Sequence, residues 1–287
     1  MPSRPVIIEA AINGGNPEAP RTPEAIAATA RACFDAGAAI VHNHIDITGD
    51  AATVAARYRE AWDPVLAVRP DALLYPTING VGDHETRFCH IAPLAESGEL
   101  RIGLIDPGSV NLGSLFTYVN DGASIEHQRS LCEQYELGPT MAIFEPGFLR
   151  ATLSMWRAGT LPAGAMIRFY FGGAAREASG DSWFGLPPTE ASLEAYLAML
   201  DGCPIPWSVA VLGGDLFASD LPRYALELGG HLRVGLEDFA GDTSPSNEHL
   251  VAQAVDAVAG AGLELASCAD TTEMLGLRPA VAAGVSR

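Results

Sequence analysis

Lysine is absent from this sequence of 287 residues, because all 17 positions counted as lysine or arginine are arginine. A Schiff base between the protein and a carbonyl group requires a lysine amine. Mechanisms of the class I aldolase type and of the pyridoxal phosphate type are therefore excluded. This absence removes one whole branch of lyase chemistry.

Cysteine is scarce, and long apolar runs are missing. The five cysteines are scattered without a C-x-x-C pair, which is typical of reduced thiols rather than of a disulfide framework. No run of about 18 apolar residues is long enough to cross a membrane. Residues 1–15 contain Glu9 and Asn13, which does not suit a signal peptide. We therefore expect a cytoplasmic protein with no membrane partner.

The charge balance is strongly acidic, with a formal net charge of −18 at pH 7. An acidic surface repels phosphate backbones and anionic lipids, so we expect no nucleic-acid partner. A small anionic substrate would need a local metal ion or an arginine to bind.

Short apolar runs alternate with longer amphipathic stretches along the whole chain. Eight β-then-α units predict parallel strands with crossover helices, and eight is the number that closes a barrel. The length suits one barrel of typically ~250 residues. We predict an α/β fold, a single (β/α)8 TIM-barrel domain over residues 1–287, with a C-terminal extension at about residues 263–287. An open doubly wound sheet would give a similar pattern and stays open as an alternative.

The positions of the predicted strands and helices along the chain rest on residues that are typical of helix starts and ends. Thr22-Pro23 and Ser246 are typical helix starts, and Gly37 is typical of a helix end. The predicted strands are Val6–Ile12, Ala39–His44, Ala72–Thr77, Arg101–Asp106, Thr140–Phe144, Met166–Phe171, Trp207–Leu212 and His231–Glu237. The predicted helices include Thr22–Ala36, Asp50–Val68, Ile125–Leu137, Glu190–Leu200 and Asp215–Leu228.

The second predicted strand ends with His42 and His44. Side chains at positions i and i+2 of a strand point to the same face. Both imidazoles therefore project together at the C-terminal end of the barrel, where barrel active sites lie. The pair is a natural half-site for zinc, which takes nitrogen ligands. Two histidines that merely fill a polar barrel mouth are the alternative.

The eighth predicted strand supplies a third ligand. Its apolar residues alternate with His231, Arg233 and Glu237. This alternation predicts that the three polar side chains point into the barrel. A charged side chain inside a barrel is costly unless it is paired or bound to a metal. Glu237 lies at the top of this strand, so we predict that it completes a metal site with His42 and His44.

Asp238 follows the glutamate directly and is a candidate general base, with Arg233 as its partner. The positive charges of the arginine and of a metal are expected to lower the pKa of this aspartate. A purely structural ion pair that holds the loop is the alternative.

Other polar residues gather where the predicted strands end, and Glu9 is a further candidate for an interior carboxylate. We predict Glu145 as a further catalytic group and several neighbours as substrate-binding residues. Each of them alone is compatible with an Asx turn or a helix cap, and their shared location gives them weight as a group. The predicted substrate-binding residues are Asn13, Thr77, Asn79, Ser109 and Asn111.

Taken together, these motifs resemble the β-keto acid cleavage enzyme family over nearly the full chain. The resemblance is carried by Ile8-Glu9-Ala10-Ala11-Ile12-Asn13-Gly14-Gly15, Val41-His42-Asn43-His44, Asp106-Pro107-Gly108-Ser109-Val110-Asn111, Phe144-Glu145-Pro146-Gly147, Leu228-Gly229-Gly230-His231-Leu232-Arg233-Val234-Gly235-Leu236-Glu237-Asp238 and Ser244-Pro245-Ser246-Asn247.

The resemblance implies a TIM barrel with one zinc ion per chain on His42, His44 and Glu237. It implies that Arg233 and Asp238 act as a base unit. Members of the family condense a β-keto acid with acetyl-CoA and release acetoacetate and a new acyl-CoA. The partners are therefore a small β-keto acid and a CoA thioester, and we expect a homo-oligomer.

The sequence departs from the family pattern around the substrate. Asp46 stands where many members have an arginine, and Leu104 stands where a hydroxyl residue is frequent. The segment at residues 77–80 lacks the usual small residues. Two other functions therefore stay open, namely a metal-dependent hydrolase that uses zinc-bound water and a barrel that binds a small acid without catalysis.

Overall fold

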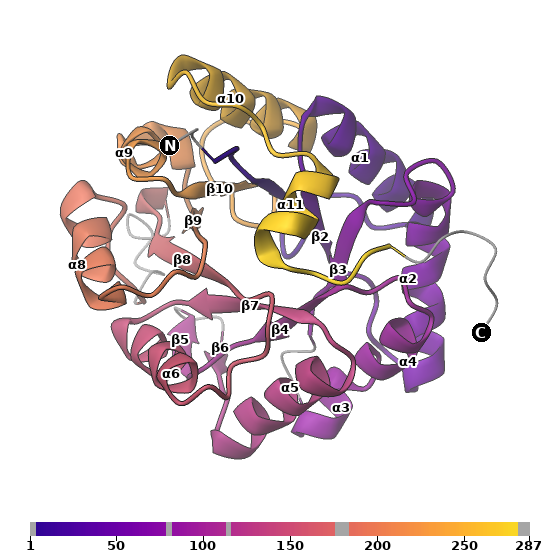
Figure 1. The fold of residues 1–287 in the computed structure, drawn as a ribbon. Helices are drawn as coiled ribbons and strands as arrows, with labels where there is room; N and C mark the ends of the chain where they lie inside the picture. Colours follow the sequence, from indigo (N-terminus) through magenta and orange to yellow (C-terminus); the bar gives the residue numbers. More distant parts are fainter. Residues whose placement is uncertain (1–3, 79–81, 113–115, 176–183, 281–287) are drawn as a thin grey trace.

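The computed structural model of the protein describes residues 4–78, 82–112, 116–175 and 184–280. Eight parallel strands form a nearly closed barrel with helices around it (Figure 1), which confirms the predicted (β/α)8 fold and excludes the open doubly wound sheet. In circular order the strands are β1 Ile8–Ala11, β2 Ile40–Asn43, β3 Leu73–Pro76, β4 Ile102–Ile105, β7 Gly138–Ile143, β8 Met166–Gly172, β9 Trp207–Leu212 and β10 His231–Val234.

The helices begin at capping residues that the sequence indicated. The Thr22 hydroxyl accepts a hydrogen bond from Ala25 N at the start of α1, and Gly37 ends that helix with a φ of 118°. Ser246 caps α10 in the same way. The helices of the outer layer are α1 Pro23–Ala36, α2 Ala51–Leu66, α3 His84–Phe88, α4 Ile91–Glu96, α5 Gly122–Gln134, α6 Pro146–Arg157, α8 Glu190–Leu200, α9 Leu221–Glu227 and α10 Asn247–Gly260.

Two parts of the predicted element pattern differ from the structure. A two-stranded hairpin, β5 Val110–Leu112 and β6 Phe116–Tyr118, follows β4 where the sequence indicated only a loop. The predicted helix Asp215–Leu228 is divided into a 3-10 turn, η1 Leu216–Ala218, and α9. The division has a local cause, because Asp215 caps η1 through Phe217 N and Pro222 suits the first turn of a new helix.

A last helix, α11 Cys268–Leu275, packs against the N-terminal end of the barrel (Figure 1). The Thr272 hydroxyl lies 3.4 Å from the Arg101 guanidinium, just before β4. The buried Leu277 side chain lies against Gly138, the first residue of β7, where a Cβ atom would come 2.2 Å from it. The C-terminal part of the chain thus covers the end of the barrel opposite to the predicted site.

All four residues of β10 are buried. Arg233 points into the barrel, where it contacts Glu9 and Asp238, as predicted, and Leu232 and Val234 belong to the apolar core. Within the described ranges we find no helix with the length and hydropathy needed to span a membrane.

Candidate active site

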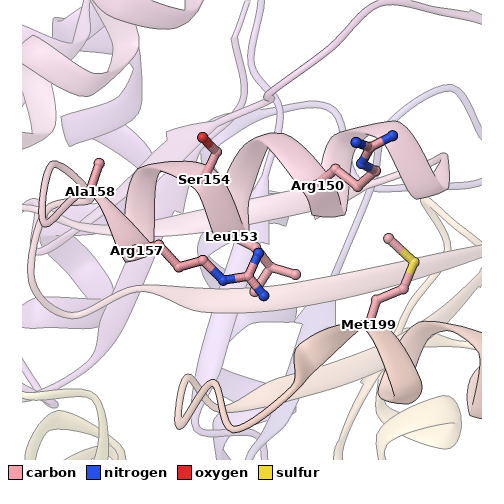
Figure 2. Close-up of a pocket in the computed structure, with 6 residues that line it drawn as sticks. All are labelled: Arg150, Leu153, Ser154, Arg157, Ala158 and Met199. Carbon is pink, nitrogen blue, oxygen red and sulfur yellow. The ribbon is translucent and has the colours of Figure 1, made fainter.

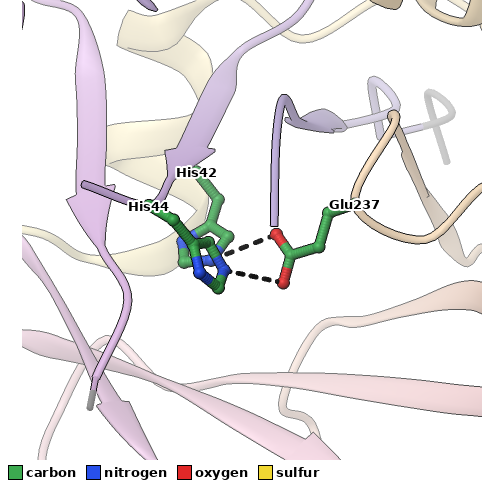
Figure 3. A group of neighbouring side chains, drawn as sticks. All are labelled: His42, His44 and Glu237. Carbon is green, nitrogen blue, oxygen red and sulfur yellow. Dashed lines mark hydrogen bonds and ion pairs between the residues drawn. The ribbon is translucent and has the colours of Figure 1, made fainter. Parts of the chain in front are cut away.

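The three predicted metal ligands meet at the C-terminal end of the barrel. His42 lies in β2, His44 follows the strand, and Glu237 follows β10 (Figure 3). The His42 Nε2 atom lies 3.3 Å from one carboxylate oxygen of Glu237, and the His44 Nε2 atom lies 3.1 Å from the other. The ligand atoms of the three residues all lie within 4.8 Å of one another.

Two glycines bring Glu237 to this place. The sequence predicted a strand through Glu237, but β10 ends at Val234 because Gly235 has a φ of 135°. A Cβ atom at Gly235 would lie 2.1 Å from Ala11 O, so only glycine fits there. Gly14, with a φ of 69°, faces the glutamate, and a Cβ atom on it would lie 2.5 Å from Glu237 Cγ. Both backbone bends serve the carboxylate.

Neighbouring polar groups hold His44 as well. The predicted strand 2 also ends one residue early, at Asn43, and His44 N donates to Asn13 Oδ1 at 2.6 Å. The Asn13 amide donates to Pro20 O and to His44 O, both at 3.0 Å. Asn13, predicted to bind substrate, therefore positions the histidine in this structure.

The three side chains form a set that could hold a metal ion, because their ligand atoms lie within 4.8 Å of one another. Two imidazole nitrogens and one carboxylate are ligand types that zinc takes. Burial lowers the pKa of His42 to about 3, so its imidazole is neutral and able to bind a metal. Burial alone would raise the pKa of Glu237, but His42, His44 and Arg233 hold it well below its usual range.

A buried charge cluster lies beneath the ligands. Arg233 donates from Nε to Asp238 at 2.7 Å and from a terminal nitrogen to Glu9 at 2.6 Å. Arg168, on β8, makes a second ion pair with Glu9, and the Tyr75 hydroxyl also donates to that carboxylate. Glu9 is fully buried, which places the carboxylate inside the barrel as the sequence indicated.

The two carboxylates of the cluster differ in their protonation. Burial would raise the pKa of Glu9, but Arg168 and Arg233 lower it below its usual range. Burial raises the pKa of Asp238 to about 6, although Arg233 opposes this. Arg233 lowers the pKa of Asp238, as expected, but burial outweighs the arginine in the metal-free protein. The arginine shares its charge with Glu9, and the neighbouring Glu237 repels a second negative charge.

A cavity of about 630 Å³ opens above this cluster. The metal ligands, Arg233 and Asp238 form part of its wall, and Thr77 lines it as well. Asp238 thus faces the same space as Glu237 and both histidines. A small acid bound there would lie next to the Asp238 carboxylate and the possible metal site at once.

Other predicted substrate-binding residues lie elsewhere. Ser109 exchanges hydrogen bonds with the backbone of Asn120, and Asn111 accepts one from Thr117 across the β5–β6 hairpin. Both therefore hold this hairpin. Asn79 lies outside the described residues.

Glu145, predicted as a catalytic group, begins α6. Its carboxylate accepts a hydrogen bond from Gly185 N at 2.9 Å. It is not among the described residues that line the cavity. In this structure the glutamate holds the segment that follows β8, and its catalytic role stays a prediction.

The sequence reasoning missed Arg168, Tyr75 and Asp106 as residues of the site. One signal was present for Arg168, because it is the charged residue in the otherwise apolar strand Met166–Gly172. A charge in such a strand of a barrel needs a partner, and Glu9 is that partner. Tyr75 and Asp106 carried no comparable signal, since aromatic residues and strand-end aspartates are common.

A second depression lies between α6 and α8, in the outer helical layer (Figure 2). Arg150 and Arg157 project from α6, and Met199 faces them from α8. The described residues that line it include no histidine, cysteine or carboxylate. It therefore offers no acid–base or metal chemistry, in contrast to the barrel cavity.

Known proteins are similar to this chain in sequence and in fold. The sequence profile of beta-keto acid cleavage enzymes matches residues 5–277. The chain belongs to this family. Among similar proteins, the 3-keto-5-aminohexanoate cleavage enzyme of Fusobacterium nucleatum subsp. nucleatum is 26% identical over 287 residues, covering 95% of this chain and 98% of that one.

Two further comparisons agree. The 3-oxoadipate:acetyl-CoA acetyltransferase of Cupriavidus necator is 25% identical over 293 residues, with 96% of each chain covered. Among solved structures, ObcA in its apo form superimposes with a TM-score of 0.71 at 18% identity, over 91% of this chain. The match covers 66% of the length of ObcA, and this likeness shows the shared fold.

Proposed function

We propose that the protein joins a β-keto acid to acetyl-CoA and releases acetoacetate and a new acyl-CoA, with one zinc ion held by His42, His44 and Glu237. The observation that carries the proposal is the cavity in which the Asp238 carboxylate, held by Arg233, lies beside the three ligand side chains. A barrel that only binds a small acid does not require a base beside a metal site, and acetyl-CoA in the name of one relative favours transfer over hydrolysis.

The names of two relatives support the substrate class. One is a 3-keto-5-aminohexanoate cleavage enzyme, and the other is a 3-oxoadipate:acetyl-CoA acetyltransferase. Both substrates are β-keto acids, and the second name includes acetyl-CoA. We extend to this chain only what the two share, which is a carboxylate next to a CH2 group and a ketone.

The reaction balances without an oxidant or reductant. The CH2 carbon of the keto acid loses a proton and attacks the acetyl carbonyl carbon, which releases CoA thiolate. The thiolate adds to the original ketone carbon, and the bond between that carbon and the former CH2 carbon breaks. The carbanion regains a proton and becomes acetoacetate, while the rest of the keto acid leaves as acyl-CoA.

In this scheme Asp238 takes the proton from the CH2 carbon and returns it after cleavage. Burial raises the pKa of this carboxylate in the metal-free protein, and a metal ion bound to Glu237 would favour its ionised form, which can accept the proton. Arg233 grips Asp238 through Nε and a terminal nitrogen, at 2.7 and 3.2 Å, and fixes the direction of the carboxylate. Glu9 holds the other side of the guanidinium and so positions Arg233.

The donor set of two imidazoles and one carboxylate suits zinc and leaves a coordination position for substrate. When bound there, zinc would supply a Lewis acid for the ketone oxygen. His42 and His44 orient the keto acid toward Asp238, because both lie in the wall of the same cavity.

We expect the isolated protein to retain about one zinc ion per chain after dialysis. His42→Ala removes a ligand atom, and Glu237→Gln replaces a charged carboxylate oxygen by a neutral amide oxygen. Each should therefore weaken metal binding by more than the roughly 10–100-fold typical for groups beyond the ligands. Metal analysis by mass spectrometry and zinc titration measure this. His249→Ala, at an exposed position on α10, is the control and should bind zinc as the original protein does.

Equal zinc binding in all four proteins, or none in any, would show that the three side chains do not hold the metal. Circular dichroism spectra show whether each variant is folded, so that a loss of metal binding is not mistaken for a loss of fold.

We also expect zinc-loaded protein to form acetoacetate from at least one member of a panel of β-keto acids, and only when acetyl-CoA is present. Liquid chromatography with mass detection measures acetoacetate and the new acyl-CoA together. Equal amounts of both products are expected, since each turnover makes one of each. Turnover without CoA would instead support a hydrolase, and no product from any member would refute the proposed function.

A further inference from the structure

The cavity has a second polar wall, opposite the metal ligands. The metal ligands belong to β2 and to the segment after β10, which flank β1 in the barrel. The circular order places β4, β7 and β8 on the far side of the barrel from these strands. Asp106 follows β4, Thr140 lies on β7, and both line the cavity. A substrate bound at the ligands therefore extends toward these two residues.

Asp106 is 94% buried at this wall, since its exposed fraction is 6%. The Tyr118 hydroxyl donates to its Oδ2 atom, and Gln128 fixes its backbone by accepting from Asp106 N at 2.7 Å. Among the residues described, no side chain donates to the other carboxylate oxygen, Oδ1, and no cation pairs with the group within 4 Å. One oxygen of a firmly held carboxylate is thus left for a ligand.

Thr140 provides an independent observation. Its exposed fraction is 3%, and its hydroxyl has no hydrogen-bond partner in the described part of the chain. β4 and β7 pair with Leu104 beside Thr140, so Asp106 lies two residues above that pair, with the same side-chain direction. A buried hydroxyl without a partner is costly. A bound molecule that reaches both groups would satisfy it.

The charges of the cavity indicate which charge the bound molecule carries at the end near Asp106 and Thr140. Arg168 and Arg233 are offset by Glu9 and Asp238. The two charges of a zinc ion would be offset by Glu237 and the carboxylate of the substrate. The charge that remains is that of Asp106.

Arg87 influences the charge of Asp106 from outside the described cavity lining. It lies 5.2 Å from the centre of the Tyr118 ring, and its guanidinium donates to Val119 O and Asn120 Oδ1. It is not part of the described cavity lining. Burial raises the pKa of Asp106 above its usual range in spite of Arg87 and Arg168, which is the direction expected for a carboxylate that lacks a close cation.

We propose that Asp106 and Thr140 form a subsite for a hydrogen-bond donor at the end of the β-keto acid remote from its carboxylate, with an ammonium group preferred over a hydroxyl. The inference rests on the proposed function and names the substrate class of the same cavity. On and directly after the same two strands as this pair, Leu104, Ala142 and Phe144 add apolar surface to the cavity, which suits an aliphatic chain as the connecting part of the substrate. A second carboxylate is disfavoured, because Asp106 would repel it.

The test compares four β-keto acids of equal chain length that end in an ammonium, hydroxyl, methyl or carboxylate group. For the zinc-loaded protein, kcat/KM should favour the ammonium acid over the methyl acid by roughly 10–100-fold. The hydroxyl acid should fall between them, and the carboxylate acid should be poorest. Asp106→Asn should bring the ratio of ammonium to methyl acid close to one, and Thr140→Val should lower it by a smaller factor.

Two matched substitutions serve as controls. Asp121→Asn changes an aspartate that caps α5, and Thr271→Val changes a buried threonine on α11 whose hydroxyl also lacks a described partner. Both should leave the ratio unchanged. As a second readout, the dissociation constant of a non-cleavable 3-hydroxy analogue with an ammonium end should rise in Asp106→Asn and stay constant in Asp121→Asn.

The outcomes separate this inference from the proposed function. If none of the four acids gives acetoacetate with acetyl-CoA, the proposed function itself is refuted. If the acids react but the ammonium acid has no advantage, or if Asp106→Asn and Thr140→Val both keep the original ratio, the subsite is overturned. Should Asp106→Asn fail to fold, the Thr140→Val ratio and the carboxylate acid still decide the question.

Discussion

Asp238→Asn is expected to lower kcat/KM by roughly a thousandfold, within the range of 10²–10⁴ typical for loss of a general base. Asparagine has nearly the same shape and still accepts a hydrogen bond from Arg233, whose Nε lies 2.7 Å from the carboxylate. It cannot take up the proton from the CH2 carbon. The loss should therefore fall on the chemical step, which initial rates over a range of keto acid concentrations measure.

The zinc content of Asp238→Asn should stay close to that of the original protein. Its unfolding temperature should fall, because the change removes a buried charged partner of Arg233, so rates are compared at a temperature at which circular dichroism shows both proteins folded. Asp215→Asn is the matched control, because Asp215 caps the short η1 turn and does not line the described cavity. The control should keep its rate. A decrease of less than about tenfold in Asp238→Asn, with zinc bound, would remove Asp238 from the role of base.

Glu9→Gln is expected to lower the free energy of unfolding by about 3–5 kcal/mol, the cost of breaking a buried ion pair by removing one partner. Glu9 is fully buried and is the shared partner of Arg168 and Arg233, whose side chains are 3% and 1% exposed. Glutamine would leave two buried guanidinium groups with only Asp238 and Glu237 nearby. Urea unfolding followed by fluorescence measures the change.

An exposed ion pair provides the comparison. Asp35→Asn breaks the pair of Arg69 and Asp35, in which the aspartate side chain is 70% exposed. Surface pairs contribute about 0–1 kcal/mol, so this variant should unfold almost as the original protein does. If Glu9→Gln costs no more than Asp35→Asn, the cluster under the site is not the rigid support described above.

The barrel and its metal ligands were predictable from local pattern. Each barrel strand is a short apolar run between polar turns. The alternation of these runs with longer amphipathic stretches therefore located all eight strands. His42 and His44 share a face because they are two residues apart. Glu237 was correctly placed near them, although for an incomplete reason. The strand ends at Val234, and the bend at Gly235, rather than alternation, brings the carboxylate to the histidines.

The far wall of the cavity was not predictable in the same way. Asp106 and Thr140 become neighbours through the pairing of β4 with β7, and they face the ligands only because the barrel closes. Such relations join residues far apart in the sequence and leave no mark on local periodicity. Ser109 and Asn111 show that strand-end polar residues also stabilise turns, as they do in the β5–β6 hairpin, and their role in substrate binding stays a prediction.

The most direct test of the proposed reaction uses acetyl-CoA that carries ¹³C in its acetyl group, with whichever β-keto acid the panel identifies as substrate. The account predicts that all label appears in the acetyl half of acetoacetate and that the new acyl-CoA is unlabelled, because its acyl carbons come from the keto acid. Mass spectrometry of both products measures this. Labelled acetate, unlabelled acetoacetate or label in the new acyl-CoA would contradict the transfer of CoA that the account requires.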